Sequence, residues 1–101
     1  MDSRMIKQLQ DMQKKMVKAQ EDLANETVTG SAGGGAVTVE MTGHHMVTAV
    51  TIDKDAVDPD DVESLQDMVL AAFNQALEKA QEMTEKKMGA ITGGMNLPGM
   101  F

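Results

Sequence analysis

One apolar stripe near the start of the chain does most to limit what the chain can fold into. Its members recur at steps of four and three residues and are Met5, Leu9, Met12, Met16, Ala19 and Leu23. This spacing places them on one side of an α-helix, so we predict a helix from Met1 to about Asn25. The stripe covers fewer than four heptads, which is too short for a long coiled coil but suits packing against another helix.

The composition changes at Glu26, where Thr, Val and Gly replace the Lys, Gln and Met of the first segment. Residues 26–32 have a weak strand pattern, and the glycines at positions 33–35 suit a turn that needs positive φ angles. Within residues 36–42, apolar side chains alternate with polar ones, and the apolar ones are Val37, Val39 and Met41. Such alternation is typical of a half-buried strand.

A third strand is predicted for residues 46–53, after a turn at Gly43, His44 and His45. Strict alternation places one set of side chains on each face of this strand. Met46, Val50 and Ile52 are expected on one face, and Val47, Ala49 and Thr51 on the other. Three consecutive strands joined by short turns most simply form an antiparallel meander.

A second, longer helix is predicted from Asp58 to about Lys87. Asp58 is the expected N-cap, Pro59 has no amide hydrogen to leave unpaired, and the acids that follow favour the positive end of the helix dipole. Residues 68–77 are apolar on nearly all sides of the helix, so one side is expected to face the sheet and another a second copy of the chain. The residues assigned to this dimer contact are Val69, Leu70, Phe73, Ala76 and Leu77.

The 101 residues are expected to form one domain at residues 1–88, followed by a flexible tail at residues 89–101. The chain has no cysteine, which excludes disulfides, thiolate nucleophiles and Cys-based zinc sites and fits a cytoplasmic location. No apolar run approaches the ~18 residues of a membrane span, so we expect no membrane segment. A core of this size leaves little room for a pocket, so we predict no enzymatic activity, cofactor or small-molecule substrate.

Three short features resemble ligand sites only superficially. The glycines at 33–35 precede a strand and lack the Lys-Ser/Thr of a phosphate-binding loop, so we predict a plain turn. His44 and His45 are adjacent and have no third ligand at a matching spacing, which favours an exposed turn over a metal site. The acids between Asp53 and Glu63 lack the glycine and order of a calcium-binding loop and are expected to be solvated or to cap the helix.

The charge of the chain is divided unevenly along its length. Nine basic and sixteen acidic residues give a net charge of −7, which argues against a surface built throughout to wrap nucleic acid. Residues 1–18, however, hold five basic and two acidic residues, whereas residues 19–67 hold one basic and eleven acidic. The basic face of the first helix is therefore either a solvated surface or a contact for phosphates. With no Trp or Tyr and two Phe, stacking on nucleic-acid bases is not expected.

Five segments occur in an order that is specific to one family. They are IKQLQDMQKKMVKAQEDL, AGGGAVTVEMTG, VTAVTID, AAFNQALEKAQEM and a tail containing Gly, Met, Leu and Pro. Together they resemble the YbaB/EbfC family of bacterial nucleoid-associated proteins over nearly the whole chain. The resemblance implies an α+β homodimer shaped like tweezers, with a long helix, a three-stranded antiparallel sheet and a second long helix in each chain. It also implies binding to double-stranded DNA, a change in DNA conformation, and roles in nucleoid organisation, gene regulation and DNA protection.

The resemblance further implies a DNA-contacting surface on both helices. On this sequence it falls on Arg4, Lys7, Lys14, Lys15 and Lys18 of the first helix and on Lys79, Lys86 and Lys87 of the second. Because the net charge is negative, we expect a local contact that salt weakens strongly and that has little sequence preference. The alternative is a dimeric scaffold for replication or repair proteins, which dock on the methionine-rich stripe while direct DNA binding stays minor.

Overall fold

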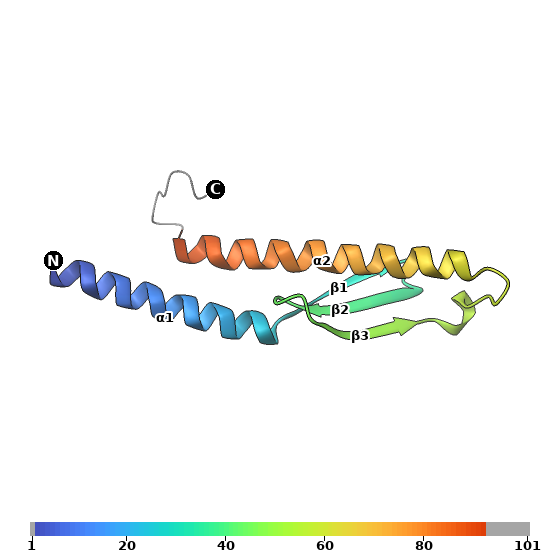
Figure 1. Ribbon diagram of the computed structural model, residues 1–101, viewed down its shortest axis with the longest axis horizontal. Helices are drawn as coiled ribbons and strands as arrows, with labels where there is room; N and C mark the ends of the chain where they lie inside the picture. The colour runs from blue at the N-terminus through green and yellow to red at the C-terminus, as the bar shows by residue number, and fades with distance from the viewer. Residues whose placement is uncertain (1, 93–101) are drawn as a thin grey trace.

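The computed structural model describes residues 2–92 of the chain. The elements in order are α1 (Ser3–Asn25), β1 (Thr27–Ala32), β2 (Val37–Thr42), β3 (Val47–Ile52), a short 3-10 helix η1 (Lys54–Ala56) and α2 (Val62–Thr92). Figure 1 shows α2 lying along one face of the sheet while α1 extends beyond the end of the sheet. The molecule is elongated, at 69 × 25 × 15 Å. The predicted α+β order of helix, three strands and helix is confirmed.

The three strands form one antiparallel sheet in the order β1-β2-β3, as the meander prediction required. The predicted glycine turn between β1 and β2 is present, and Gly33, Gly34 and Gly35 all have positive φ angles. Among the described helices, none has both the length and the apolar character needed to cross a membrane.

The core lies between β2 and α2. Val37, Val39 and Met41 of β2 are buried against Ala72, Ala76 and Ala80 of α2. Alanines four residues apart share one side of a helix and leave its backbone close to the sheet. The apolar side of β2 thus packs against the apolar side of α2, as expected for a two-layer α+β domain.

Side chains of α2 close the outer edge of β1. Gln75 accepts a hydrogen bond from the Ser31 amide through Oε1 (2.7 Å), and Lys79 donates from Nζ to the Thr29 carbonyl (2.9 Å). Within residues 2–92, no side chain makes a comparable bond to the backbone of β3. One edge of the sheet is therefore covered and the other is open to pairing.

The predicted division of β3 into two faces is wrong at Val47. The register pairs Val50 with Val39, Ala49 with Glu40, and then Val47 with Met41, so the strand has a bulge at Thr48. The bulge inserts one residue and returns Val47 to the face that carries Val50 and Ile52. Thr48 donates to the Glu40 carbonyl and carboxylate, which stabilises this local geometry.

The ends of α2 also differ from the prediction. Asp58 accepts from the Asp60 amide in a turn, and Asp61 is the residue that caps the helix by accepting from the Ser64 amide (3.3 Å). At the other end α2 continues to Thr92, so residues 89–92 of the predicted tail are helical. The remaining predicted tail, residues 93–101, lies outside the described residues.

Candidate nucleic-acid interface

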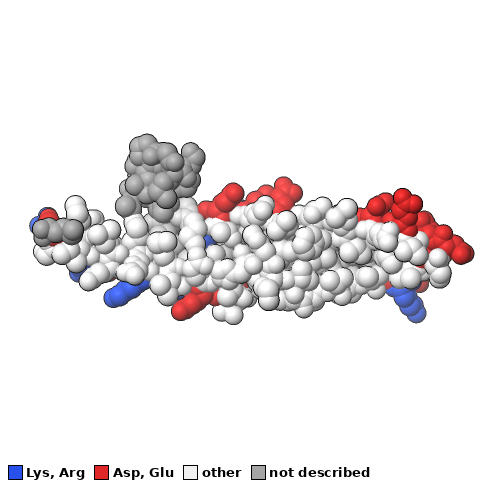
Figure 2. Space-filling view, in the orientation of Figure 1, with Lys and Arg blue, Asp and Glu red and all other residues white. Residues whose placement is uncertain are grey.

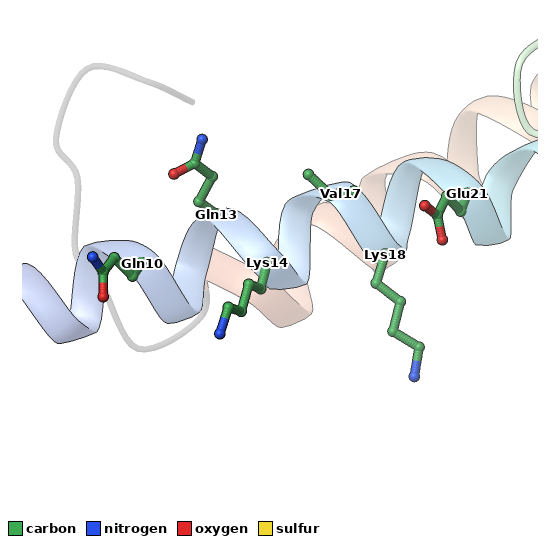
Figure 3. Close-up of a pocket in the computed structure, with 6 residues that line it drawn as sticks. All are labelled: Gln10, Gln13, Lys14, Val17, Lys18 and Glu21. Atoms are coloured by element: carbon green, nitrogen blue, oxygen red, sulfur yellow. The ribbon is translucent and has the colours of Figure 1, made fainter.

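The basic side chains of α1 form a row on the part of the helix that projects from the sheet. Lys14 and Lys18 are one helical turn apart, and Figure 3 shows both side chains extended in the same direction, away from Gln13 and Val17. Arg4 and Lys7 continue the row at helical spacing, and the exposed carboxylate of Asp11 lies in the row between Lys7 and Lys14. We call Arg4, Lys7, Lys14 and Lys18 the basic face. All four are exposed, and their side chains make no hydrogen bond or ion pair within residues 2–92.

The strongest concentration of acid lies at the opposite end of the molecule. Figure 2 shows red side chains gathered at the end formed by η1 and the start of α2 and again over the middle of the molecule, and blue ones along α1 and at the η1 end. The acids of this end are Asp53, Asp55, Asp58, Asp60, Asp61 and Glu63. The long axis measures 69 Å, whereas the Debye length at physiological ionic strength is about 8 Å. Salt therefore screens the acidic end from the far half of α1.

The three predicted basic contacts on α2 have different surroundings. Lys79 is bound to the Thr29 carbonyl at the β1 edge. Lys86 is exposed beside a shallow depression that Glu26 and Glu82 also line. Lys87 forms ion pairs with Glu26 and Asp22. The structure thus brings four of the eight predicted residues into one row and places the three of α2 near carboxylates or the sheet edge.

Lys15 lies beside the basic face, at a groove between the two helices. The groove has a volume of about 600 Å³ and is lined by Met5, Gln8, Leu9, Asp11, Met12, Lys15 and Ile91. The apolar stripe of α1 therefore faces the end of α2 without filling the space between them. Ala19 and Leu23 are the stripe members that are buried, because they lie where α1 reaches the sheet.

A second apolar surface lies on the sheet and α2. Val47, Val50 and Ile52 share the core face of the sheet but are exposed, because α2 packs over β1 and β2. Gln75 and Lys79 of α2 point to the β1 edge, so residues on the opposite flank of the helix lie on the β3 side. Phe73 and Leu70 are on that flank and are exposed. We call these five residues the open apolar surface.

The residues assigned from sequence to a dimer contact divide into three groups. Leu70 and Phe73 belong to the open apolar surface, and Val69 and Leu77 are partly buried beside the core. Ala76 has no exposed surface, because it packs against β2 within its own chain. Its assignment to a free contact surface is therefore wrong, and the helical pattern alone could not separate it from its neighbours.

The glycine turn, the histidine pair and the acidic segment make contacts that stabilise the fold. The glycines at 33–35 form a turn, and His44 donates from Nε2 to the Gln20 carbonyl of α1 (2.9 Å). Hydrogen bonds from the Ser64 hydroxyl and amide hold the pKa of Asp61 below its ordinary value. No group of three or more potential metal ligands occurs in the part of the chain that the structure describes.

The fold and this surface define an elongated α+β protein with a projecting basic helix. The profile of the YbaB/EbfC DNA-binding family matches residues 1–95. A nucleoid-associated protein of Pelotomaculum thermopropionicum is 50% identical over 99 residues, which cover 98% of this chain and 94% of that protein. One from Chloroflexus aurantiacus is 51% identical over 102 residues and covers both chains fully.

A solved structure supports the same fold. The crystal structure of the uncharacterized protein HP0035 from Helicobacter pylori superposes with a TM-score of 0.65 at 24% sequence identity, covering 94% of this chain and 97% of that one. The chain is therefore a member of the YbaB/EbfC DNA-binding family, as its motifs predicted.

Proposed function

We propose that this protein binds double-stranded DNA as a homodimer, in the nucleoid of the cytoplasm, and changes the conformation of the DNA. The observation that carries the proposal is the basic face: four exposed cations and one carboxylate, Asp11, lie in one row on a projecting helix, and the four cations form no ion pair among residues 2–92. Family membership supports DNA as the partner. Roles in nucleoid organisation, gene regulation and DNA protection are consequences of this activity.

The chemistry of the face fits the phosphate backbone better than the bases. Lysine ammonium groups on flexible stems neutralise phosphates and release counterions, which gives affinity without sequence information. Gln10 and Gln13 lie beside Lys14, but no aromatic side chain accompanies them on α1. We therefore expect weak sequence preference and a steep dependence on salt.

The open apolar surface supports a homodimer. Monomeric proteins rarely leave large apolar patches uncovered, and these exposed apolar side chains adjoin an unprotected sheet edge. A second copy that packs here covers Val50, Ile52 and Phe73, and a symmetric contact closes the assembly at two chains. Each dimer then carries two basic faces, which increases the number of phosphates that one particle can neutralise.

Fluorescence anisotropy with a random duplex, at several salt concentrations, tests the DNA-binding part of the proposal. Light scattering at the same protein concentration tests the dimer. Affinity that falls steeply with salt, together with a two-chain mass, supports the proposal. A monomer mass overturns the proposed dimer, and an absence of binding at low salt overturns the proposed DNA binding.

The groove between the helices favours a second candidate, the dimeric scaffold for proteins. Met5, Leu9 and Met12 present flexible thioether and alkyl groups that can adapt to an apolar partner segment. Affinity capture from nuclease-treated lysate distinguishes the two functions. Recovery of a stoichiometric partner by a protein that does not bind purified duplex would favour the scaffold.

A further inference from the structure

Lys87 of α2 reaches across to the point where α1 ends and β1 begins. Its Nζ atom is 2.7 Å from Glu26 Oε1 and 3.8 Å from Asp22 Oδ2. The Lys87 side chain is 21% exposed, whereas those of Asp22 and Glu26 are 44% and 46% exposed. The Lys87 side chain is therefore more covered by the protein than those of its two carboxylate partners.

This junction is also the negative end of a helix dipole. The Glu26 amide donates to the Asp22 carbonyl (2.8 Å) and so closes the last turn of α1. A cation is stabilised beside the final carbonyls of a helix, and here two carboxylates strengthen that effect. The position suits an ammonium group that holds α1 in place.

The turn between β2 and β3 forms hydrogen bonds with the same end of α1. The Gly43 amide donates to the Leu23 carbonyl (2.9 Å), and the Thr84 hydroxyl of α2 lies within hydrogen-bond distance of the Gly43 carbonyl (3.3 Å) and of the Ala80 carbonyl in its own helix (3.1 Å). Together with His44 and its bond to Gln20, these contacts link the end of α1 to α2 through the turn. Lys87 is the direct ionic link between the two helices among the described residues.

Farther out, side chains do not fill the space between α1 and the end of α2. The groove of about 600 Å³ separates Met5, Leu9 and Met12 from Ile91. From Ser3 to Asn25 the helix is about 33 Å long at ~1.5 Å per residue, so a rotation of ~10° at the junction moves its far end by roughly 6 Å. The angle of the basic face is therefore determined at the junction.

We propose that Lys87 is a positioning residue: through Glu26 and Asp22 it fixes the angle at which the basic face of α1 meets DNA, and it does not itself contact DNA. This inference rests on the proposed function and changes the role that family resemblance assigns to Lys87. Without the ion pair α1 samples a wider range of angles. Binding must then restrict that range, which lowers affinity by loss of preorganisation.

The angle can be measured without DNA. Because the chain has no cysteine, the substitutions Ser3→Cys and Gly89→Cys place one spin label near the outer end of each helix. A Cβ at position 89 would meet no atom within 4 Å, so the substitution itself introduces no steric clash. Mixing with excess unlabelled protein ensures that each distance is measured within one chain. We expect a narrow distribution in the parent protein and a broader or shifted one in Lys87→Met.

Lys86→Met is the matched control, since it removes the same charge from the adjacent exposed residue. It should leave the distance distribution unchanged. Glu26→Gln tests the pair from its other side and should broaden the distribution as Lys87→Met does. The swap Lys87→Glu with Glu26→Lys should restore the narrow distribution. An unchanged distribution in both Lys87→Met and Glu26→Gln overturns the proposal.

DNA titration with the same variants separates this inference from the proposed function. Lys87→Met should bind severalfold more weakly than Lys86→Met, and the charge swap should recover most of the loss. Failure of the parent protein to bind duplex would refute the proposed function. The distance measurement would still show whether Lys87 fixes the angle of α1. Equal affinity of Lys87→Met and Lys86→Met, with a broadened distribution, would overturn the role in DNA binding.

Discussion

Gly30 of β1 lies so close to Ala76 of α2 that a Cβ atom at position 30 would come within 2.9 Å of the Ala76 Cβ. The same atom would also overlap the Ala72 carbonyl oxygen and the Ala76 amide nitrogen. Backbone atoms cannot rotate away as a side chain can. The approach of α2 to the sheet, and with it the burial of Val37 and Val39, therefore depends on the absence of a side chain at Gly30.

Gly30→Ala should lower the free energy of unfolding by about 2–3 kcal/mol, because α2 must move away from the sheet to admit the methyl group. Urea denaturation followed by circular dichroism measures this change. Gly89→Ala is the control, since position 89 is helical and open. It should be neutral or stabilising by up to about 0.5 kcal/mol. Equal stabilities of the two variants would contradict the close contact.

Asp61 should make the start of α2 sensitive to acid. The hydroxyl and amide of Ser64 stabilise the Asp61 carboxylate and lower its pKa. A carboxyl whose pKa is lower in the folded state contributes stability at pH values above its unfolded pKa and loses it as the pH falls through the folded pKa. Asp61→Ala should therefore lower Tm at neutral pH and have a smaller effect in strong acid. A Tm difference that stays constant into strong acid would contradict the capping role.

The open apolar surface makes a prediction about oligomeric state. Val50→Asp places a charge on the uncovered core face of β3 and should shift the mass measured by light scattering from two chains toward one. Val57→Asp is the matched control, because Val57 has a similar exposure but lies outside the sheet, after η1. If Val50→Asp remains as dimeric as Val57→Asp at low micromolar concentration, the contact is elsewhere.

Much of the fold could be predicted from the sequence because local periodicity determines it. The alternation of Val37, Val39 and Met41 identified the buried strand, and the spacing of the apolar residues identified both helices. The bulge at Thr48 was missed, since a single inserted residue leaves no signal in a short alternating strand. Asp61 was missed as the cap because Asp58, Asp60 and Asp61 are chemically equivalent caps until the chain path is known.

The candidate site was predictable only where it lies on one element. Helical spacing alone places Lys14 and Lys18 together on α1. The role of Lys87 depends on Glu26, which is 61 residues away in the sequence, so no local pattern could indicate it. The sequence likewise does not show that Lys79 binds the Thr29 carbonyl at the edge of β1, because the two residues are far apart along the chain.

The central claim, that the basic face binds the DNA backbone, is tested most directly by the salt dependence of affinity for a random duplex. The parent protein is compared with Lys18→Gln and with Lys54→Gln, a matched loss of one positive charge at the acidic end. Lys18→Gln should weaken binding and make the slope of log K against log salt shallower by about one, whereas Lys54→Gln should do neither. If the two variants have the same affinity and slope, the basic face of α1 is not the DNA-binding surface.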